Sequence, residues 1–375
     1  MSTGKNYINL LPEELLSEIF TRVPAKSVGR CKCVSKPWAS LISDPKFIEA
    51  HLTKTKHISG LTLISTETDP GILYSVHFLN DKKNVVNCDV FALKLNLKNC
   101  CNKWSKVWGS YDGLVLVQDI RRKKLLINPT TLESKQIPPV PCGYRLNSIF
   151  DLFGFGYDSS CDDYVVVAIC YEFGSFSTYV YMLKTNQWNK VGFSPYEHVS
   201  PYDHVNVQTR APGAAGIFLE GSLHWLAKKF DDRNSCLISA FNIAKKEFSQ
   251  VPPPKGVFDY ITRCPRLGVL KGCLCLTTGV FNRNELWVMR EYGVVESWVK
   301  LSVFLTEDSS IVSLDFQEDG LFMLEGGRFV FLVSNAKEVI LQDMKVIGLP
   351  QDFRLGMTFV DTLVSPNYID YKKST

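Results

Sequence analysis

The spacing of apolar residues changes abruptly near residue 60 of the chain. Before this point, apolar positions recur at helical intervals within short segments that are bounded by proline. After it, short apolar runs of strand length alternate with turns rich in Gly, Asn, Asp and Lys. The pattern predicts a small helical module followed by a much larger region built from strands.

Four short helices are predicted within the first ~50 residues. Pro12 suits a first helical turn, and Pro24 ends the first segment. Ser35 and Asp44 are suitable caps for the third and fourth helices. In the first segment the apolar residues form two adjoining stripes: Leu15, Leu16, Ile19, Phe20 and Val23. Because one buried face needs only one stripe, the sequence raises the question of what the second stripe contacts.

Two kinds of half-unit recur through the rest of the chain at intervals of about 50 residues. The first is a turn followed by an apolar strand: "DGLVLV" (112–117), "DDYVVV" (162–167), "EGSLHWL" (220–226), "KGCLCL" (271–276) and "DGLFML" (319–324). The second is a strand that runs into a polar turn: "LLINPTT" (125–131), "YMLKTNQW" (181–188), "SAFNIAKKEF" (239–248), "LWVMREYGVVESW" (286–298) and "FLVSNAKEVI" (331–340). The two kinds alternate along the chain, so each repeat contains one of each.

This repeat predicts a β-propeller, because a period of about 50 residues with about four short strands is the length of one blade. Five units are visible in the sequence. Strands within 60–110, with "FRLGMTFV" (353–360) as a closing strand, are expected to supply a sixth blade. The predicted fold is therefore mostly β, with a small α-helical module in front of a propeller of about six blades.

Composition narrows the function classes. The 375 residues are 45% hydrophobic, which is enough for a large core. The net charge of +4 arises within residues 1–60, which hold nine Lys and Arg against five Asp and Glu. Since no basic run is interleaved with aromatic residues, we expect no nucleic-acid partner.

The chain is also expected to have no membrane partner. No apolar run approaches the ~20 residues of a membrane-spanning helix, and "YVVVAICY" (164–171) has the length of a strand. The twelve cysteines follow no recognisable secretory signal. We therefore expect reduced thiols and an intracellular protein, in the cytoplasm, the nucleus or both.

The stretch "LPEELLSEIFTRVPAKSVGRCKCVSKPWASLISDPKFIEAHL" (11–52) resembles an F-box. It has the Leu-Pro start, the Leu-x-x-Glu-Ile core, the "CVSKPW" segment and the "LISDPKF" exit of that family. The remainder resembles the F-box-associated, kelch-like domain of plant F-box proteins, through "LLINPTT", "FGFGYDSSCDDYVVV" and "GSLHWL". The resemblance implies an F-box at 1–52, a linker at 53–60 and a substrate-binding propeller-like domain at 61–375.

The resemblance further implies the function of a substrate-recognition subunit in an SCF-type (Skp-cullin-F-box) ubiquitin ligase. Such a module docks on a Skp-type adaptor, which binds the cullin and, through it, the RING subunit. The residues that match adaptor-binding positions are Leu11, Pro12, Leu15, Ile19 and Trp38. Gly29 departs from the family, which usually has a bulky apolar residue there, and its flexibility is expected to weaken the second helix.

Other interpretations remain open at this point. The apolar residues of the first helix could all pack inward on the propeller. The chain could be a propeller-fold carbohydrate-active enzyme, or an interaction scaffold that takes no part in a ligase. The six tryptophans of the repeat region, Trp104, Trp108, Trp188, Trp225, Trp287 and Trp298, are expected to fill the spaces between blades, and a sugar-stacking role for one or two is the alternative.

The tandem segment "SPYEHVSPYDHV" (194–205) most resembles an enzyme site, because it places two histidines and two carboxylates close together. A solvated loop between blades is the simpler interpretation. Such a loop could contact a target protein, through Tyr196, His198, Tyr202 and His204.

We expect no catalytic residue, no bound metal and no cofactor. A RING needs paired Cys-x-x-Cys ligands, which the sequence lacks, and Cys273 with Cys275 is the spacing of a strand. The identity of the target protein is not encoded in any recognisable motif.

Overall fold

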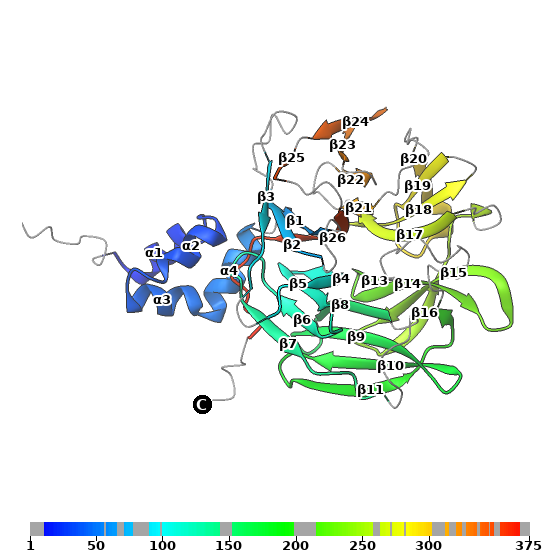
Figure 1. Cartoon of the computed structure of the whole chain (residues 1–375), viewed down its shortest axis with the longest axis horizontal. Coiled ribbons are helices and arrows are strands. Elements are labelled where there is room, and N and C mark those ends of the chain that lie inside the picture. The colour runs from blue at the N-terminus through cyan, green and yellow to red at the C-terminus, as the bar shows by residue number, and fades with distance from the viewer. Residues whose placement is uncertain are drawn as a thin grey trace, which may run out of the picture.

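The computed structural model shows four helices at one side of a ring of β-sheets (Figure 1). The structure describes residues 11–55, 58–65, 71–77, 90–97, 100–142, 152–198, 215–257, 263–270, 272–280, 283–301, 312–314, 320–324, 328–335, 338–344, 346–348 and 353–367. None of the helices in these ranges combines the length and the apolar character needed to span a membrane.

The helical module contains α1 (Glu13–Phe20), α2 (Ala25–Cys31), α3 (Lys36–Ser43) and α4 (Pro45–Thr55). Local capping explains where α3 and α4 begin. The Ser35 hydroxyl accepts a hydrogen bond from the Trp38 amide at 3.3 Å, and the Asp44 carboxylate accepts one from the Lys46 amide at 2.8 Å. The predicted four helices and their caps are confirmed.

Six groups of four antiparallel strands follow, and each is one blade of a propeller. The innermost strands of the third and fourth blades also pair with each other in parallel. Blade 1 combines β26 (Phe353–Val360) with β1 (Ile58–Ser65), β2 (Leu73–His77) and β3 (Val90–Lys94). Blade 2 contains β4 (Trp104–Tyr111), β5 (Leu114–Asp119), β6 (Lys124–Ile127) and β7 (Ser134–Ile137). Blade 3 contains β8 (Leu152–Asp158), β9 (Asp163–Glu172), β10 (Ser175–Met182) and β11 (Gln187–Phe193).

Blade 4 contains β13 (Ala215–Leu219), β14 (Ser222–Lys229), β15 (Asp232–Asn242) and β16 (Glu247–Val251). Blade 5 contains β17 (Arg263–Leu270), β18 (Cys273–Val280), β19 (Arg283–Met289) and β20 (Trp298–Leu301), with the short helix η4 (Val295–Ser297) before β20. Blade 6 contains β21 (Val312–Leu314), β22 (Gly320–Leu324), β23 (Arg328–Asn335) and β24 (Glu338–Met344). Two short strands lie beside this set: β12 (Glu197–His198) pairs with β14, and β25 (Val346–Ile347) pairs with β3.

The repeated half-units of the sequence correspond to fixed positions in the blades. The first kind forms the second strand, and the second kind forms the third strand with the turn into the fourth. Tight hairpins precede several second strands, as at Asp112-Gly113 and Glu220-Gly221, where both residues have positive φ angles. This backbone suits the twist of a two-residue hairpin, and Asp-Gly is a sequence that favours it. The predicted propeller of about six blades is confirmed.

The ring closes through strands from opposite ends of the chain. β26 pairs antiparallel with β1, so blade 1 takes its innermost strand from residues 353–360 and its other three from the start of the domain. The predicted closing strand "FRLGMTFV" is therefore confirmed. Closure matters because it gives β1 an inner partner, and an unpaired edge at this position would be open to unwanted pairing.

The boundary between the helical module and the propeller is shorter than the sequence predicted. α4 continues to Thr55, and β1 begins at Ile58. Most of the predicted linker at 53–60 therefore belongs to a helix or a strand. The predicted end of the helical module at residue 52 missed the last turn of α4, because no breaking residue follows Leu52 directly.

Aromatic side chains join neighbouring blades, as predicted for the tryptophans. Trp104, Trp108 and Trp225 are almost fully buried. Trp188 donates a hydrogen bond from its indole nitrogen to the Pro138 carbonyl at 2.8 Å, and Trp298 donates to the Pro252 carbonyl at 2.8 Å. In both pairs the tryptophan lies in the fourth strand of one blade, and the proline follows the fourth strand of the preceding blade.

The two ends of the propeller carry different connections. Within each blade the strands are counted from the innermost outward, so β26 is the first strand of blade 1. The turns between first and second strands, and between third and fourth strands, lie at one end of the propeller, the near end. The hairpins between second and third strands lie at the opposite end, the far end. After β26 the chain runs along the near end of blade 2, where the Asn128 side chain donates hydrogen bonds to the carbonyls of Thr362 and Val364 at 3.0 and 2.8 Å.

Gly113 explains how closely this final segment approaches blade 2. A Cβ atom at Gly113 would lie 2.1 Å from Thr362 Cγ2 and 2.3 Å from the Val360 carbonyl oxygen. Its φ angle of +79° also favours glycine. Residues 361–367 are therefore seated tightly against the turn that begins β5.

The helical module rests on the same segment. Leu363 is 2% exposed and belongs to the core of the helices, whereas Val364 belongs to the core between blades 2 and 3. Ile48 and Leu52 of α4 also pack against that second core. One short segment thus contributes adjacent side chains to both domains, which fixes the helices against blade 2. Figure 1 shows them beside the ring, next to blades 1 and 2.

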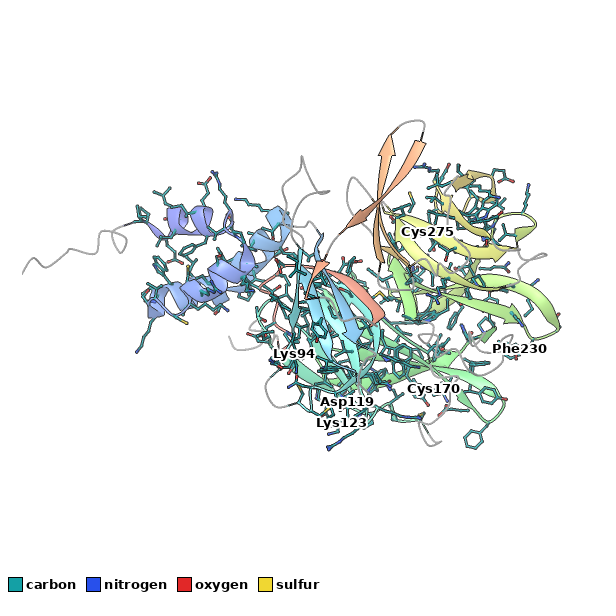
Figure 2. The ribbon with its side chains drawn as sticks, turned by 45° about the horizontal axis from the view of Figure 1, so that its top comes forward. Lys94, Asp119, Lys123, Cys170, Phe230 and Cys275 are labelled. Atoms are coloured by element: carbon teal, nitrogen blue, oxygen red, sulfur yellow. The ribbon has the colours of Figure 1, made fainter. Side chains whose placement is uncertain are left out.

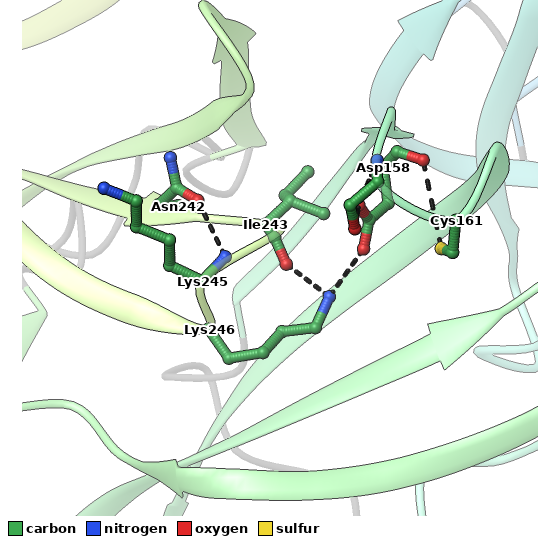
Figure 3. Close-up of polar contacts among 7 residues, drawn as sticks. Asp158, Cys161, Asn242, Ile243, Lys245 and Lys246 are labelled. Carbon is green, nitrogen blue, oxygen red and sulfur yellow. Dashed lines mark hydrogen bonds and ion pairs between the residues drawn. The ribbon is translucent and has the colours of Figure 1, made fainter.

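Blades 3 and 4 are joined by an ion pair with one buried partner (Figure 3). Lys246 Nζ lies 2.9 Å from a carboxylate oxygen of Asp158, which is 3% exposed. Burial opposes ionisation of Asp158, but hydrogen bonds from Ser160 and Lys246, with the Lys246 charge, hold the pKa of that carboxyl below its ordinary value. Lys246 also donates to the Ile243 carbonyl.

We predict that Lys246→Asn lowers the free energy of unfolding by about 1–3 kcal/mol, because it leaves a buried carboxylate without its cation. Asn tolerates the positive φ of this position, so the backbone is not the cause. The matched control is Lys245→Asn, since Lys245 is exposed and points away from Asp158 in Figure 3. Urea unfolding of both variants tests this, and equal losses in the two would contradict it.

Candidate protein-binding surfaces

The first helix exposes a regular apolar stripe. Leu11, Leu15 and Ile19 are 39%, 48% and 49% exposed, and they recur every four residues on one side of α1. The other stripe is packed, since Phe20 is 6% exposed and lies in the core of the helices. The alternative in which all the apolar residues of this helix pack inward is therefore wrong. The second stripe is available to a partner.

Pro12 and Trp38, the other two predicted binding residues, differ in their surroundings. Pro12 is exposed and precedes the first turn of α1. Trp38 is half-buried, and its ring meets Phe20 edge to face with centroids 4.8 Å apart. Trp38 thus links α3 to α1, so its remaining exposed surface is the part that a partner could contact.

The helices share a compact core behind this surface. Its buried members are Phe20, Ala25, Val28, Ile42, Phe47 and Leu363. His51 is fully buried beside it, and its Nε2 makes a hydrogen bond of 2.8 Å with the Val23 carbonyl oxygen. Burial lowers the pKa of His51, so the ring is neutral and structural.

Gly29 lies on the side of α2 that faces Leu363. A Cβ atom there would lie 3.8 Å from Leu363 Cδ2, which is an ordinary van der Waals distance. No positive φ requires glycine at this position. The space around Gly29 therefore accommodates a methyl group, and the glycine is a local weakness of α2 rather than a packing requirement.

The predicted target contacts of the tandem segment are only partly described. Tyr202 and His204 lie outside the described residues. His198 is 2% exposed, and its ring packs against Phe176, Trp225 and Phe248. Its role as an exposed contact is thus wrong, because β12 pairs with β14 and turns the ring into blade 4. Tyr196 is half-buried, with its ring edge to face with Phe248.

The buried His198 makes a contact that resembles part of a hydrolytic site. Its Nε2 lies 2.7 Å from the Ser194 hydroxyl, and burial lowers the pKa of His198 to about 3. A catalytic pair needs a group that orients the other ring nitrogen and a path for substrate. Within the described residues the Nδ1 atom has no hydrogen-bond partner, and Ser194 is 4% exposed. The arrangement is that of a buried core histidine.

His224 is buried in a comparable way. Its ring nitrogens make hydrogen bonds with the Ile217 carbonyl oxygen at 3.0 Å and the Tyr292 hydroxyl at 2.6 Å. Burial lowers the pKa of His224 to about 4, although the contact with Ile217 opposes the change. Among the described residues no group of three or more His, Cys, Asp and Glu side chains is placed to hold a metal ion. Cys275 is buried and Cys273 half-buried, as expected for a strand.

The far end of the propeller carries exposed apolar side chains that sequence analysis did not single out. Ile120, Phe173 and Phe230, at the hairpin tips of blades 2, 3 and 4, are 44%, 83% and 51% exposed. Phe193, near the tip of blade 3, is 61% exposed. A lone aromatic residue inside a polar turn, as in "KKFDD", was the available signal. In Figure 2, Phe230 projects from the side of the propeller opposite the helices.

Comparison with known families agrees with this architecture. Residues 66–355 match the family described as F-box associated beta propeller domain, and residues 8–49 match the F-box domain. The chain belongs to the F-box associated beta-propeller family. Its helical module is accordingly called the F-box below.

Curated relatives are similar over most of their length. The chain is 28% identical over 347 residues to F-box protein CPR1 of Arabidopsis thaliana, covering 88% of this chain and 81% of that protein. It is 28% identical over 385 residues to F-box/kelch-repeat protein At3g23880 of the same plant, covering 95% and 96%. The similarity of this chain to proteins named as F-box proteins therefore extends over most of its length.

Solved structures match at lower similarity. A chain of a nidogen/laminin complex matches with a TM-score of 0.48 at 10% identity, covering 81% of this chain and 98% of that chain. TolB from Acinetobacter baumannii matches with a TM-score of 0.45 at 10% identity, covering 82% and 69%. At these levels the likeness says nothing about function.

We predict that Gly29→Ala raises the free energy of unfolding by about 0.5–1 kcal/mol, because alanine favours the helix and the added methyl group fits beside Leu363. Gly113→Ala is the contrasting variant and should destabilise the protein, because its methyl group would overlap Thr362. Thermal and urea unfolding of both variants measure the difference. A loss of stability in Gly29→Ala would contradict the conclusion that a methyl group fits between α2 and Leu363.

We also predict that stability falls as pH drops below about 6.5, the ordinary pKa of histidine. The folded protein holds His198 and His224 neutral, while the unfolded chain takes up protons on both. At pH 5 each histidine should cost about 2 kcal/mol, and the loss grows toward the lowered pKa. Melting temperatures at pH 7.5 and 5 should therefore differ less for the His198→Gln, His224→Gln double variant. If the difference in melting temperature between pH 7.5 and pH 5 is the same in the double variant and the unmodified protein, the two histidines are not the cause of the pH dependence.

Proposed function

We propose that this protein is the substrate-recognition subunit of an SCF-type E3 ubiquitin ligase. Its F-box docks on a Skp-type adaptor, which connects it to the cullin and RING subunits. Its propeller captures a target protein for ubiquitination. The match to both domain families and the F-box relatives support this assignment.

The observation that carries the proposal is the exposed stripe of Leu11, Leu15 and Ile19. A helix that leaves one apolar face uncovered, while its other face completes a core, is suited to a groove on a partner. These residues coincide with the positions that match adaptor contacts in the F-box resemblance. Pro12 and the outer surface of Trp38 extend the same proposed contact.

The target is proposed to bind at the far end of the propeller. The F-box occupies the near end through residues 361–367, so the hairpin tips of blades 2 to 4 face away from it. Exposed Phe173 and Phe230 at these tips are the kind of aromatic anchors that dominate protein interfaces. Tyr202 and His204 stay predicted target contacts, and Tyr196 contributes at most its exposed part.

This function requires no bond chemistry from the chain itself. The receptor acts by holding target lysines near a ubiquitin-loaded conjugating enzyme, which raises their effective concentration. The buried environment of the Ser194–His198 pair gives no support to the enzyme alternative. The proposal therefore assigns to this chain a non-catalytic role.

We predict that the double variant Leu15→Ala, Ile19→Ala weakens binding of a Skp-type adaptor by about tenfold or more, because it removes two exposed apolar contacts. Its melting temperature as a single chain should stay near that of the unmodified protein, since both side chains are half-exposed. Val299→Ala is the matched control, because Val299 is 43% exposed on β20 of the propeller. Calorimetric titration with the adaptor and co-purification of the cullin measure the two steps.

Trp38→Ala should behave differently from the stripe variants. It should lower both adaptor affinity and melting temperature, because the ring also packs on Phe20. If the folded stripe variant keeps full adaptor affinity, the proposed adaptor surface is wrong. If the unmodified protein binds the adaptor but recovers no cullin, the protein is a scaffold outside the ligase.

A further inference from the structure

One corner of the far end is strongly basic. It is formed by the end of β3 in blade 1, the chain leading into β4, and the hairpin between β5 and β6 in blade 2. We call it the basic corner, and its exposed members are Lys94, Lys103, Arg121, Arg122 and Lys123. Figure 2 labels Lys94 and Lys123 on this part of the propeller.

Backbone hydrogen bonds hold these segments side by side. The Ile120 amide donates to the Lys103 carbonyl at 3.1 Å, which attaches the hairpin tip to the chain entering blade 2. The amides of Trp104 and Leu95 donate to the carbonyls of Gly71 and Leu73, at 2.8 and 2.9 Å. Residues next to Lys94 and Lys103 are therefore anchored on the same short stretch of blade 1.

The hairpin tip is also rigid. Asp119 exchanges backbone hydrogen bonds with Lys123 and Arg122, and its carboxylate accepts a further bond from the Lys123 amide at 2.8 Å. A turn fixed in this way loses little conformational entropy when it binds a partner. The corner thus presents its cations in a preorganised arrangement.

The described part of the corner holds more cations than carboxylates. Among the described residues at the far end of blades 1 and 2, Asp119 supplies the single carboxylate, and it is 4% exposed. That carboxylate also accepts from the Cys101 thiol at 3.4 Å, so it is turned toward the protein. Ile120, 44% exposed, adds an apolar contact among the cations.

We propose that the basic corner binds a carboxylate-rich segment of the target protein, with Ile120 contacting an apolar residue of that segment. This inference rests on the proposed function and specifies the chemistry of the target. Charge complementarity supports it, because clustered cations attract an acidic segment and favour it over basic or neutral ones. The position at the far end leaves the corner accessible while the F-box is bound to its adaptor.

A nucleic acid is a poorer fit to the same surface. Single-stranded nucleic acids are bound through aromatic side chains on which bases stack. The tryptophans nearest to the corner, Trp104 and Trp108, are 1% and 2% exposed and offer no stacking surface. The net charge of only +4 also gives little general attraction to a duplex.

The test uses the full chain and a fluorescent peptide of about twelve residues made of Asp, Glu and Leu. The triple variant Lys103→Gln, Arg121→Gln, Lys123→Gln should bind this peptide about tenfold more weakly or worse. The matched control Lys26→Gln, Lys46→Gln, Lys245→Gln removes the same charge from exposed residues away from the corner, and it should bind within about twofold of the unmodified protein. Binding should weaken as NaCl rises from about 0.05 to about 0.5 M.

Three results would overturn the proposal. The first is equal peptide affinity in both triple variants. The second is equal affinity for a peptide in which Gln and Asn replace the carboxylates. The third is tighter binding of a single-stranded oligonucleotide of the same charge. Adaptor binding measured on the same preparations separates these failures from a failure of the proposed function, because the corner variant should bind the adaptor normally.

Discussion

The antiparallel pairing of β26 with β1 is the contact on which the rest of the structure depends. It closes the ring of blades and covers the inner edge of β1, which would otherwise be open to unwanted pairing. It also places the following residues, 361–367, against blade 2, where Asn128 holds two of their carbonyls. Leu363 and Val364 then enter the cores of the F-box and the propeller, respectively. The closure of the propeller ring and the position of the F-box on the propeller therefore depend on the same segment, residues 353–367.

This shared origin separates the two proposed binding tasks in space. The F-box packs against the near end of blade 2, and the exposed stripe of α1 lies outside its core. The far end keeps the hairpin tips, with aromatic side chains on blades 3 and 4 and cations on blades 1 and 2. An adaptor and a target could then bind together without competing for surface, which is what a receptor that works by proximity needs.

Features encoded locally were predictable from the sequence, and features that depend on distant residues were not. Asp112-Gly113 specifies its hairpin by itself, and Ser35 caps its helix within one turn. The two apolar stripes of α1 likewise follow from residue spacing. The burial of His198 was missed, because it depends on the pairing of β12 with β14 about thirty residues away. The proximity of Gly29 to Leu363 brings together residues from opposite ends of the chain, and no local sequence pattern near either residue predicts it.

The position of the closing segment has a consequence for how the protein is made. Residues 353–367 leave the ribosome after every blade strand and helix that they hold together. Until they emerge, β1 lacks its inner neighbour and the F-box core lacks Leu363. The nascent chain must therefore carry an open ring and an incomplete helical core through nearly all of its synthesis. Both domains reach their final form in one late step, and during that interval the edge of blade 1 is the surface most in need of a chaperone.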